Sequence, residues 1–275
     1  MNAKPNETMR ARRDKHLQRF EFIGWAGAVI ALTCALPVMG AAASDRQALW
    51  HVVCACVANF QLTGAAFPCL KVDLSGGVQN GFVVLRPPFG KTDTILTPTR
   101  KVIGVEDTWL QTPSSPNYFL AAWNARELAP EGAETPSALA VNSSSSRSQD
   151  QLHIHIGCLV AGARLGLQAA AAKLPIGVWQ RIEFVIPDAD VWAYRTGSPN
   201  LAGFDPFRLA AQGLAVTTAE RARLIMAVAA VRVDARDEFF VLASRADLGG
   251  SHPQVTAEDV VDPTCPKRAN VSQPK

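Results

Sequence analysis

Polar and apolar residues alternate over residues 149–158, and this alternation constrains the fold more than any other feature of the chain. A period of two is typical of a β-strand that turns one face toward a core. The apolar members would face that core, and Gln151, His153, His155 and Gly157 would share the opposite face. The chain has five histidines, and these two stand far from the other three. The pattern therefore predicts an imidazole pair on one open strand face.

An imidazole pair can bind a metal ion, divide acid and base work, or act as a nucleophile with a phosphate ligand beside it. Two structural histidines are the plain alternative. The residues before the strand favour chemistry, because Asn142 ends a short apolar run and a serine-rich loop follows it. Arg147, Ser148 and Gln149 in this loop can donate hydrogen bonds to phosphate oxygens. An apolar strand, a polar loop and the histidine strand therefore follow one another, and this order predicts a phosphate site beside the histidines.

The order of these motifs resembles bacterial CDP-diacylglycerol pyrophosphatases, a branch of the histidine-triad (HIT-like) superfamily of nucleotide hydrolases and transferases. The resemblance rests on Asn142, Gln149 and the run over residues 151–157. Three earlier blocks support it, at residues 81–86, 96–107 and 115–126. Together with the N-terminal segment, the resemblance covers most of residues 20–265.

The family triad is His-x-His-x-His, and this chain has Gln151 at the first position. The middle histidine is the nucleophile in the superfamily, so the resemblance assigns that role to His153. His155 then becomes the third, phosphate-binding member, which also helps to protonate the leaving oxygen. The other alignment would place His153 first, His155 in the middle and Gly157 last. The first alignment is preferred because it keeps the family's spacing to the polar residues upstream.

The resemblance implies hydrolysis of CDP-diacylglycerol to CMP and phosphatidate through a cytidylyl-histidine intermediate, without a metal ion or other cofactor. The expected substrate-binding residues are Asn142, Arg147, Ser148, Gln149, Gln151 and Arg100. A histidine nucleophile must be unprotonated, and its reference pKa is about 6.5, so activity is expected to fall in acid. Three alternatives stay open. They are a periplasmic His-x-His metal-binding protein, an inactive nucleotide or lipid binder, and a transferase that passes CMP to an acceptor other than water.

The N-terminal 44 residues predict a membrane anchor. Residues 1–19 carry six Lys or Arg against two acidic residues, and residues 22–44 contain no charge. As a helix the uncharged run would be roughly 34 Å long, enough for a bilayer core of about 30 Å. The basic flank predicts a cytoplasmic tail at 1–19, a single span at 20–44 and a catalytic domain in the periplasm, at the bacterial inner membrane. A cleaved signal peptide ending near the alanines at 41–43 is the alternative.

The net charge of +3 comes from this tail, which leaves about −1 for the rest of the chain. The charge therefore gives no support to nucleic acid as a partner. The expected partners are the lipid nucleotide substrate and the membrane.

Export from the cytoplasm permits disulfides among the five cysteines beyond residue 44. Cys54 and Cys56 are too close to bridge each other, so one of them is predicted to pair with Cys69. Cys158, at the end of the histidine strand, is predicted to pair with Cys265. The alternative is free, buried thiols.

We expect an α+β domain over residues 45–265, a HIT-like antiparallel sheet with flanking helices, followed by a tail at 266–275. Strands are expected near 81–86, 94–97, 138–142, 152–158 and 178–185, and helices near 46–58, 115–128, 160–173 and 204–215. A C-terminal hairpin of 224–233 and 238–244 is expected as an added half, which could repeat the first layout without its histidines. Residues 188–203, and the chain from 249 on except at Cys265, are expected to be loop.

Overall fold

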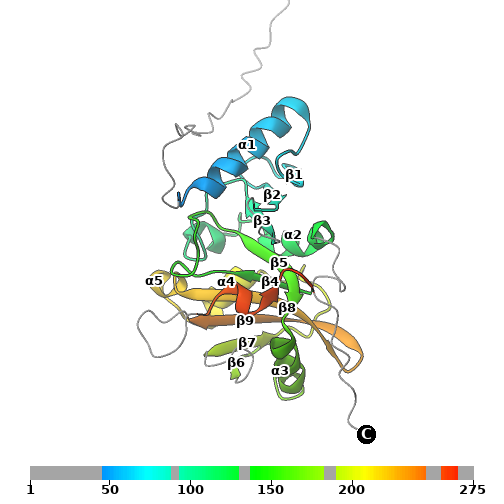
Figure 1. Ribbon diagram of the computed structural model, residues 1–275. Coiled ribbons are helices and arrows are strands. Elements are labelled where there is room, and N and C mark those ends of the chain that lie inside the picture. The colour runs from blue at the N-terminus through cyan, green and yellow to red at the C-terminus, as the bar shows by residue number, and fades with distance from the viewer. Residues whose placement is uncertain (1–44, 88–92, 130–136, 183–189, 246–254, 266–275) are drawn as a thin grey trace, which may run out of the picture. The chain divides into compact units, whose positions relative to one another are not determined.

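The computed structural model describes residues 45–87, 93–129, 137–182, 190–245 and 255–265 (Figure 1). The expected cytoplasmic tail, the expected span at 20–44 and the tail at 266–275 lie outside these residues. Within the described ranges, no helix combines the length and the hydropathy needed to cross a bilayer.

The described strands form one antiparallel sheet in the order β1-β2-β3-β5-β4-β8-β9-β7-β6, and β10 pairs with β5 off this path. The strands are β1 Lys71–Asp73, β2 Phe82–Leu85, β3 Thr94–Pro98, β4 Ala138–Val141, β5 Ile154–Leu159, β6 Trp179–Ile182, β7 Val191–Arg195, β8 Leu224–Val233, β9 Arg236–Arg245 and β10 Val261–Asp262. The expected strands of the first half and the expected histidine strand are confirmed. So is the α+β class.

Helices cover both faces of this sheet. They are α1 Ala48–Thr63, α2 Tyr118–Asn124, α3 Ala161–Ala171, α4 Pro206–Gly213 and α5 Thr218–Arg221, with 3₁₀ turns η1 Thr108–Gln111, η2 Arg126–Leu128 and η3 Ala257–Asp259. Local sequence explains several starts. Asn117 caps α2 at the Leu120 N–H, and Asp205 caps α4 just before Pro206. The expected helix at 115–128 is shorter than predicted, because it ends at Asn124 and continues only as η2.

The sheet has two halves with the same connectivity. From the centre outward, one half runs β4-β5-β3-β2 and the other runs β8-β9-β7-β6. A helix precedes each half (α1 and α3), and another helix follows its second strand (α2 and α4). The topology agrees with the expected repeat. The hairpin β8–β9 is not a peripheral extension, however, because β8 pairs along β4 at the centre of the sheet. Phe240 and Leu242 on β9, the counterpart of β5, belong to the apolar core under α3.

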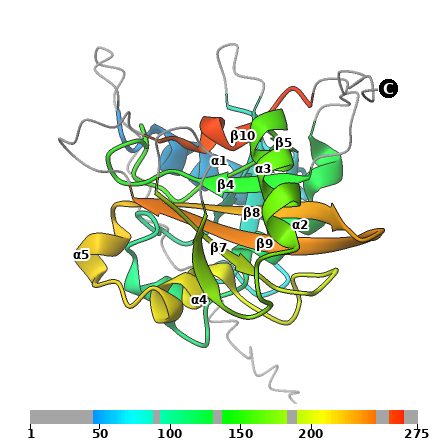
Figure 2. The ribbon, with the colours of Figure 1, turned by 90° about the horizontal axis from the view of Figure 1, so that it is seen from below.

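The histidines lie between two apolar clusters on one sheet face. On this face, α1 packs over β1, β2 and β3 through residues such as Val53 and Leu85. The helix α3 lies across the central strands and packs on residues such as Ala227 (Figure 2). Because β5 lies between β3 and β4, His155 on this strand and His153 directly before it lie where one cover ends and the other begins. The opposite face carries a core closed by α2 and α4.

The C-terminal segment corrects one expectation. Residues 255–265 are not loose: they form η3 and β10, and Val261 and Asp262 pair with the end of β5. Gly157 makes this approach possible, because a Cβ there would lie 2.7 Å from Cγ1 of Val261. The predicted disulfide between Cys158 and Cys265 is confirmed, with Cα atoms 5.0 Å apart.

Two further expectations are resolved. Cys56, rather than Cys54, forms the predicted bridge to Cys69, with Cα atoms 5.7 Å apart.

The expected loop at 188–203 is wrong over Val191–Arg195, which is strand β7. Glycine and proline nearby conceal this short run of β-forming residues in the sequence, and its pairing with β9 on one side and with β6 on the other reveals it.

Candidate active site

His153 is a buried imidazole directly before β5, and a backbone group two residues earlier holds it. Its Nδ1 lies 2.8 Å from the backbone oxygen of Gln151. A carbonyl oxygen can only accept, so Nδ1 carries the hydrogen and the neutral ring has its lone pair on Nε2. Burial lowers the pKa of His153 to about 4, and the neighbouring His155 adds to the shift. The ring is therefore neutral at physiological pH, with the lone pair on Nε2.

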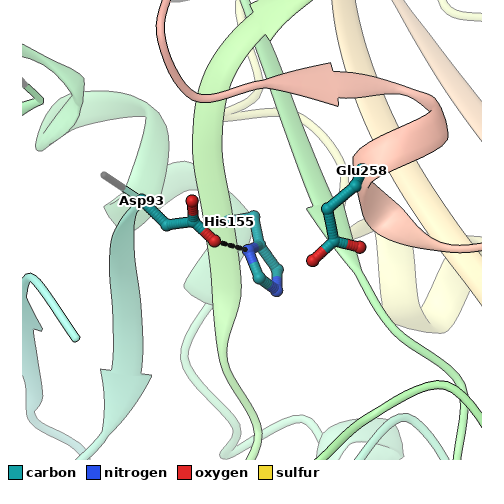
Figure 3. A group of neighbouring side chains, drawn as sticks. All are labelled: Asp93, His155 and Glu258. Atoms are coloured by element: carbon teal, nitrogen blue, oxygen red, sulfur yellow. Dashed lines mark ion pairs between the residues drawn. The ribbon is translucent and has the colours of Figure 1, made fainter. Parts of the chain in front are cut away.

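His155 stands between two carboxylates, from Asp93 and from Glu258 (Figure 3). Its ring centroid lies 5.1 Å from that of His153. Its Nδ1 lies 3.3 Å from an oxygen of Asp93, the residue directly before β3. Its Nε2 is buried and has no hydrogen-bond partner among the described residues. The two carboxylates therefore make the surroundings of this ring negatively charged.

The C-terminal segment delivers Glu258 to the histidines, and Asn142 holds it there. The Asn142 side-chain oxygen accepts a hydrogen bond of 2.7 Å from the backbone N–H of Ala257. Partial burial raises the pKa of Glu258, but the neighbouring His155 and hydrogen bonds that include the Asn142 side chain outweigh it, so the net pKa is lowered. The carboxylate therefore stays ionised beside the imidazole pair.

Gln151, at the first triad position, is fully buried. Its side-chain nitrogen donates to the backbone oxygens of Pro98 and Arg100, each at 3.0 Å, and to the Thr97 hydroxyl at 3.2 Å. Its side-chain oxygen accepts from the Val102 N–H at 3.2 Å. Gln151 therefore fixes the turn after β3 against the histidine strand, while its own carbonyl sets the His153 tautomer.

Arg147 is buried in an ion-pair network. It makes a bidentate pair with Glu106, at 2.9 and 2.6 Å, and reaches Asp150 at 3.3 Å. Gly104 leaves the space for this pair, since a Cβ there would lie 2.8 Å from Cζ of Arg147. The guanidinium therefore orders the loop before the histidine strand. Direct contact between Arg147 and a substrate phosphate stays a prediction.

The structure brings four of the predicted residues to one small pocket beside His153. Its lining is Gly104, Val141, Asn142, Arg147, Gln151, Leu152 and His153. Three other predicted residues are placed differently. Ser148 is exposed on the loop. The side-chain amide of Gln149 accepts a hydrogen bond from the Leu49 N–H and donates one to the backbone oxygen of Asp45, at the start of α1. The Arg100 guanidinium stacks on the Trp109 ring, 4.1 Å from its centroid. Their roles toward substrate stay predictions.

Sequence reasoning missed the two carboxylates. Asp93 precedes a strand that was predicted, and its register places Ile95 opposite His155, which brings Asp93 to the same face. Glu258 is remote in sequence. The predicted bridge between Cys158 and Cys265 was the one sequence signal that could have found Glu258. This bridge brings the C-terminal segment to the histidine strand, and Glu258 lies seven residues before Cys265.

The same three side chains could hold a metal ion. Asp93, His155 and Glu258 each offer a ligand atom, and these atoms lie within 4.8 Å of one another. One imidazole nitrogen and two carboxylate oxygens suit a zinc-class divalent cation. The metal-binding alternative lacked a third ligand in the sequence, and the fold supplies two candidates.

Comparison with known proteins places the chain. The family model for CDP-diacylglycerol pyrophosphatase matches residues 44–269. The chain belongs to the CDP-diacylglycerol pyrophosphatase family. It is 32% identical to a CDP-diacylglycerol pyrophosphatase of Yersinia pestis over 228 residues, which cover 81% of this chain and 85% of the relative. A probable CDP-diacylglycerol pyrophosphatase of Mycobacterium leprae is 31% identical, with 87% of each chain covered. The family membership confirms the predicted enzyme class, a hydrolase of the CDP-diacylglycerol pyrophosphatase type.

Proposed function

We propose that the chain hydrolyses CDP-diacylglycerol with His153 as a covalent nucleophile. The observation that carries this proposal is the neutral His153 ring, whose Nδ1 hydrogen is directed to Gln151 and whose Nε2 keeps the lone pair. Nε2 forms a bond to the α-phosphorus of the CMP moiety, and the bond from that phosphorus to the bridging oxygen breaks. Phosphatidate leaves with the bonding electrons. Water then attacks the cytidylyl-histidine, which releases CMP and restores Nε2.

His155 acts beside this nucleophile. Its buried, unpartnered Nε2 supports a role in contacting a phosphate oxygen or handing a proton to the leaving oxygen. Asp93 on one side fixes the ring through Nδ1, and Glu258 faces it from the C-terminal segment. In this arrangement His153 makes and breaks the bond to phosphorus, while His155 compensates the charge that develops on oxygen.

The chain works at a membrane surface in this proposal, because its substrate is a lipid. The uncharged residues 22–44 behind a basic flank support an anchor in the inner membrane with the enzyme domain in the periplasm. The disulfides Cys56–Cys69 and Cys158–Cys265 fit such an oxidising compartment. A HIT-like ancestry is supported by the His-x-His strand inside an antiparallel sheet with two similar halves.

Turnover in excess chelator tests the chemistry. The full chain in lipid nanodiscs, treated with EDTA and assayed on CDP-diacylglycerol, is expected to give CMP and phosphatidate at the untreated rate. The proposed nucleophile needs no metal, because His153 is neutral without one. A loss of activity in EDTA that zinc or manganese restores would instead assign Asp93, His155 and Glu258 to a catalytic metal. Magnesium added alone serves as the control for ionic effects on the membrane.

The pH dependence follows from the lowered pKa of His153. The reactive form is the neutral ring, and the folded-state pKa of about 4 lies below the ordinary value of 6.5. The neutral ring therefore persists through pH 5, where a solvent-exposed histidine would be mostly protonated. We therefore expect protonation of His153 to lower kcat/KM only near pH 4. The measurement is kcat/KM from pH 3.5 to 8, with a check at each pH that the protein is folded. An acidic fall centred near 6.5 in folded enzyme would contradict a buried nucleophile.

A further inference from the structure

Exposed apolar side chains gather at the end of α1. The described residues include eight large apolar side chains that are well exposed, and three of them lie within nine positions in the sequence. Leu62 is 84% exposed, Phe67 78% and Leu70 41%. We call residues 62–70 the apolar loop. Single exposed apolar residues are ordinary on a surface, whereas such a group marks a contact with something apolar.

The apolar loop is braced rather than slack. The Asn59 side-chain nitrogen donates to the backbone oxygens of Ala65 and Phe67, at 3.0 and 2.8 Å. The disulfide between Cys56 on α1 and Cys69 ties the far end of the loop back to the helix. These contacts hold Phe67 outward, so its exposure is built into the fold.

The loop lies close to the active site along the sheet. Lys71 pairs with Val84, Leu85 pairs with Ile95, and Ile95 pairs with His155. The end of the loop at Leu70 therefore falls within about one residue of the row that contains His155. Three strand spacings of about 4.8 Å separate β1 from β5, which places the backbone of Leu70 about 14 Å from the backbone of His155. One surface can reach both.

The charges beside the loop suit a phospholipid surface. Residues 61–70 contain no acidic or basic residue, and the next residue, Lys71, has a side chain that is 46% exposed and lies 3.7 Å from an oxygen of Asp73. An apolar tip with a cation at its edge is the arrangement by which proteins enter the acyl boundary beneath anionic headgroups. A water-soluble partner would not require an uncharged, apolar loop beside an active site whose substrate is a lipid.

We propose that Leu62, Phe67 and Leu70 insert into the phospholipid bilayer and thereby hold the active site over its lipid substrate. This inference rests on the proposed function, because it takes CDP-diacylglycerol in a membrane as the substrate. The loop is a second membrane contact, separate from the segment at 22–44. It orients the domain at the surface, whereas a tether alone would only keep the domain near it.

The test compares membrane-bound with dissolved substrate. The full chain in vesicles of phosphatidylcholine and phosphatidylglycerol is assayed on long-chain CDP-diacylglycerol in the same bilayer, and separately on a short-chain CDP-diacylglycerol in solution. The double variant Leu62→Ser with Phe67→Ser is expected to lose about tenfold on the membrane substrate, given the apolar area withdrawn from the bilayer. It should keep the wild-type rate on the soluble substrate. Leu165→Ser is the matched control, since Leu165 is 60% exposed on α3.

A direct readout accompanies the kinetics. Tryptophan emission from Phe67→Trp should be quenched by lipids brominated on their acyl chains, beyond the quenching seen in wild type. An equal loss of the double variant on both substrates, an unchanged rate on the membrane substrate, or no added quenching would each overturn the proposal. Failure of the proposed chemistry is distinguishable, because the wild type would then fail on the soluble substrate as well.

Discussion

The variant His153→Ala is expected to lose at least about a thousandfold in kcat for CDP-diacylglycerol hydrolysis, as expected for removal of a covalent nucleophile. The reason is that Nε2 of His153 carries the lone pair that attacks phosphorus, because the Nδ1 hydrogen is donated to the backbone oxygen of Gln151. The measurement is release of CMP from labelled substrate. Rapid quenching of the wild type should also show label bound to the protein through an acid-labile phosphoramidate, and the variant should show none.

The matched control is His51→Ala. His51 also has a carboxylate nearby, with its Nδ1 3.5 Å from Asp45, but it lies on α1, and its side chain is 31% exposed. Its loss should leave turnover within about twofold of the wild type, as expected for a residue outside the chemistry. Substantial turnover by folded His153→Ala, together with loss in His155→Ala, would move the nucleophile to His155 and favour the second alignment of the triad.

Replacement of Arg147 by alanine is expected to lower the free energy of unfolding by about 3 kcal/mol, because it breaks a largely buried ion pair and leaves a carboxylate without its cation. The Arg147 side chain is 6% exposed and its partner Glu106 is 20% exposed. The bidentate geometry also ties the loop before the histidine strand to the turn after β3. Denaturant unfolding of the full chain, followed by tryptophan fluorescence, measures the loss.

Arg181→Ala provides the comparison for that variant. Arg181 pairs with Asp190, but both side chains are more than half exposed, so the loss should stay below about 1 kcal/mol. An Arg147→Ala protein of unchanged stability with a raised KM for CDP-diacylglycerol would contradict the structural role. It would support the phosphate contact that the sequence predicted for Arg147.

Local patterns account for the parts of the fold that the sequence predicted well. The alternation over 149–158 predicts a strand with His153 and His155 on one face, and the structure has β5 over Ile154–Leu159, with His153 directly before it. The long hairpin is readable because two apolar runs flank the polar turn at residues 234–237. The bridge Cys158–Cys265 was predicted from the sequence, and so was a bridge to Cys69, but only the structure assigns Cys56 rather than Cys54 as its partner.

The position of the hairpin was not readable, and neither was strand β7. Pairing of β8 with β4 joins residues nearly ninety positions apart, and no local period records which strand will be the neighbour. Likewise, the sequence places Gln149 and Arg147 beside the histidines, but side-chain geometry commits them to α1 and to Glu106. A residue that is close to the histidines in sequence can still point its side chain away from them, because the turn between sets that direction.

The amino-acid sequence alone is enough to predict the strand with the paired histidines and to indicate the family to which the chain belongs. The surroundings of the two histidines come from tertiary contacts: the carbonyl that sets the His153 tautomer, the burial that keeps its ring neutral, and the carboxylates of Asp93 and Glu258 around His155. The physical reason is that tautomer, protonation and charge depend on atoms within a few ångströms. Here those atoms come from an adjacent strand and from a segment about one hundred residues farther along the chain, which a disulfide and one asparagine side chain hold in place.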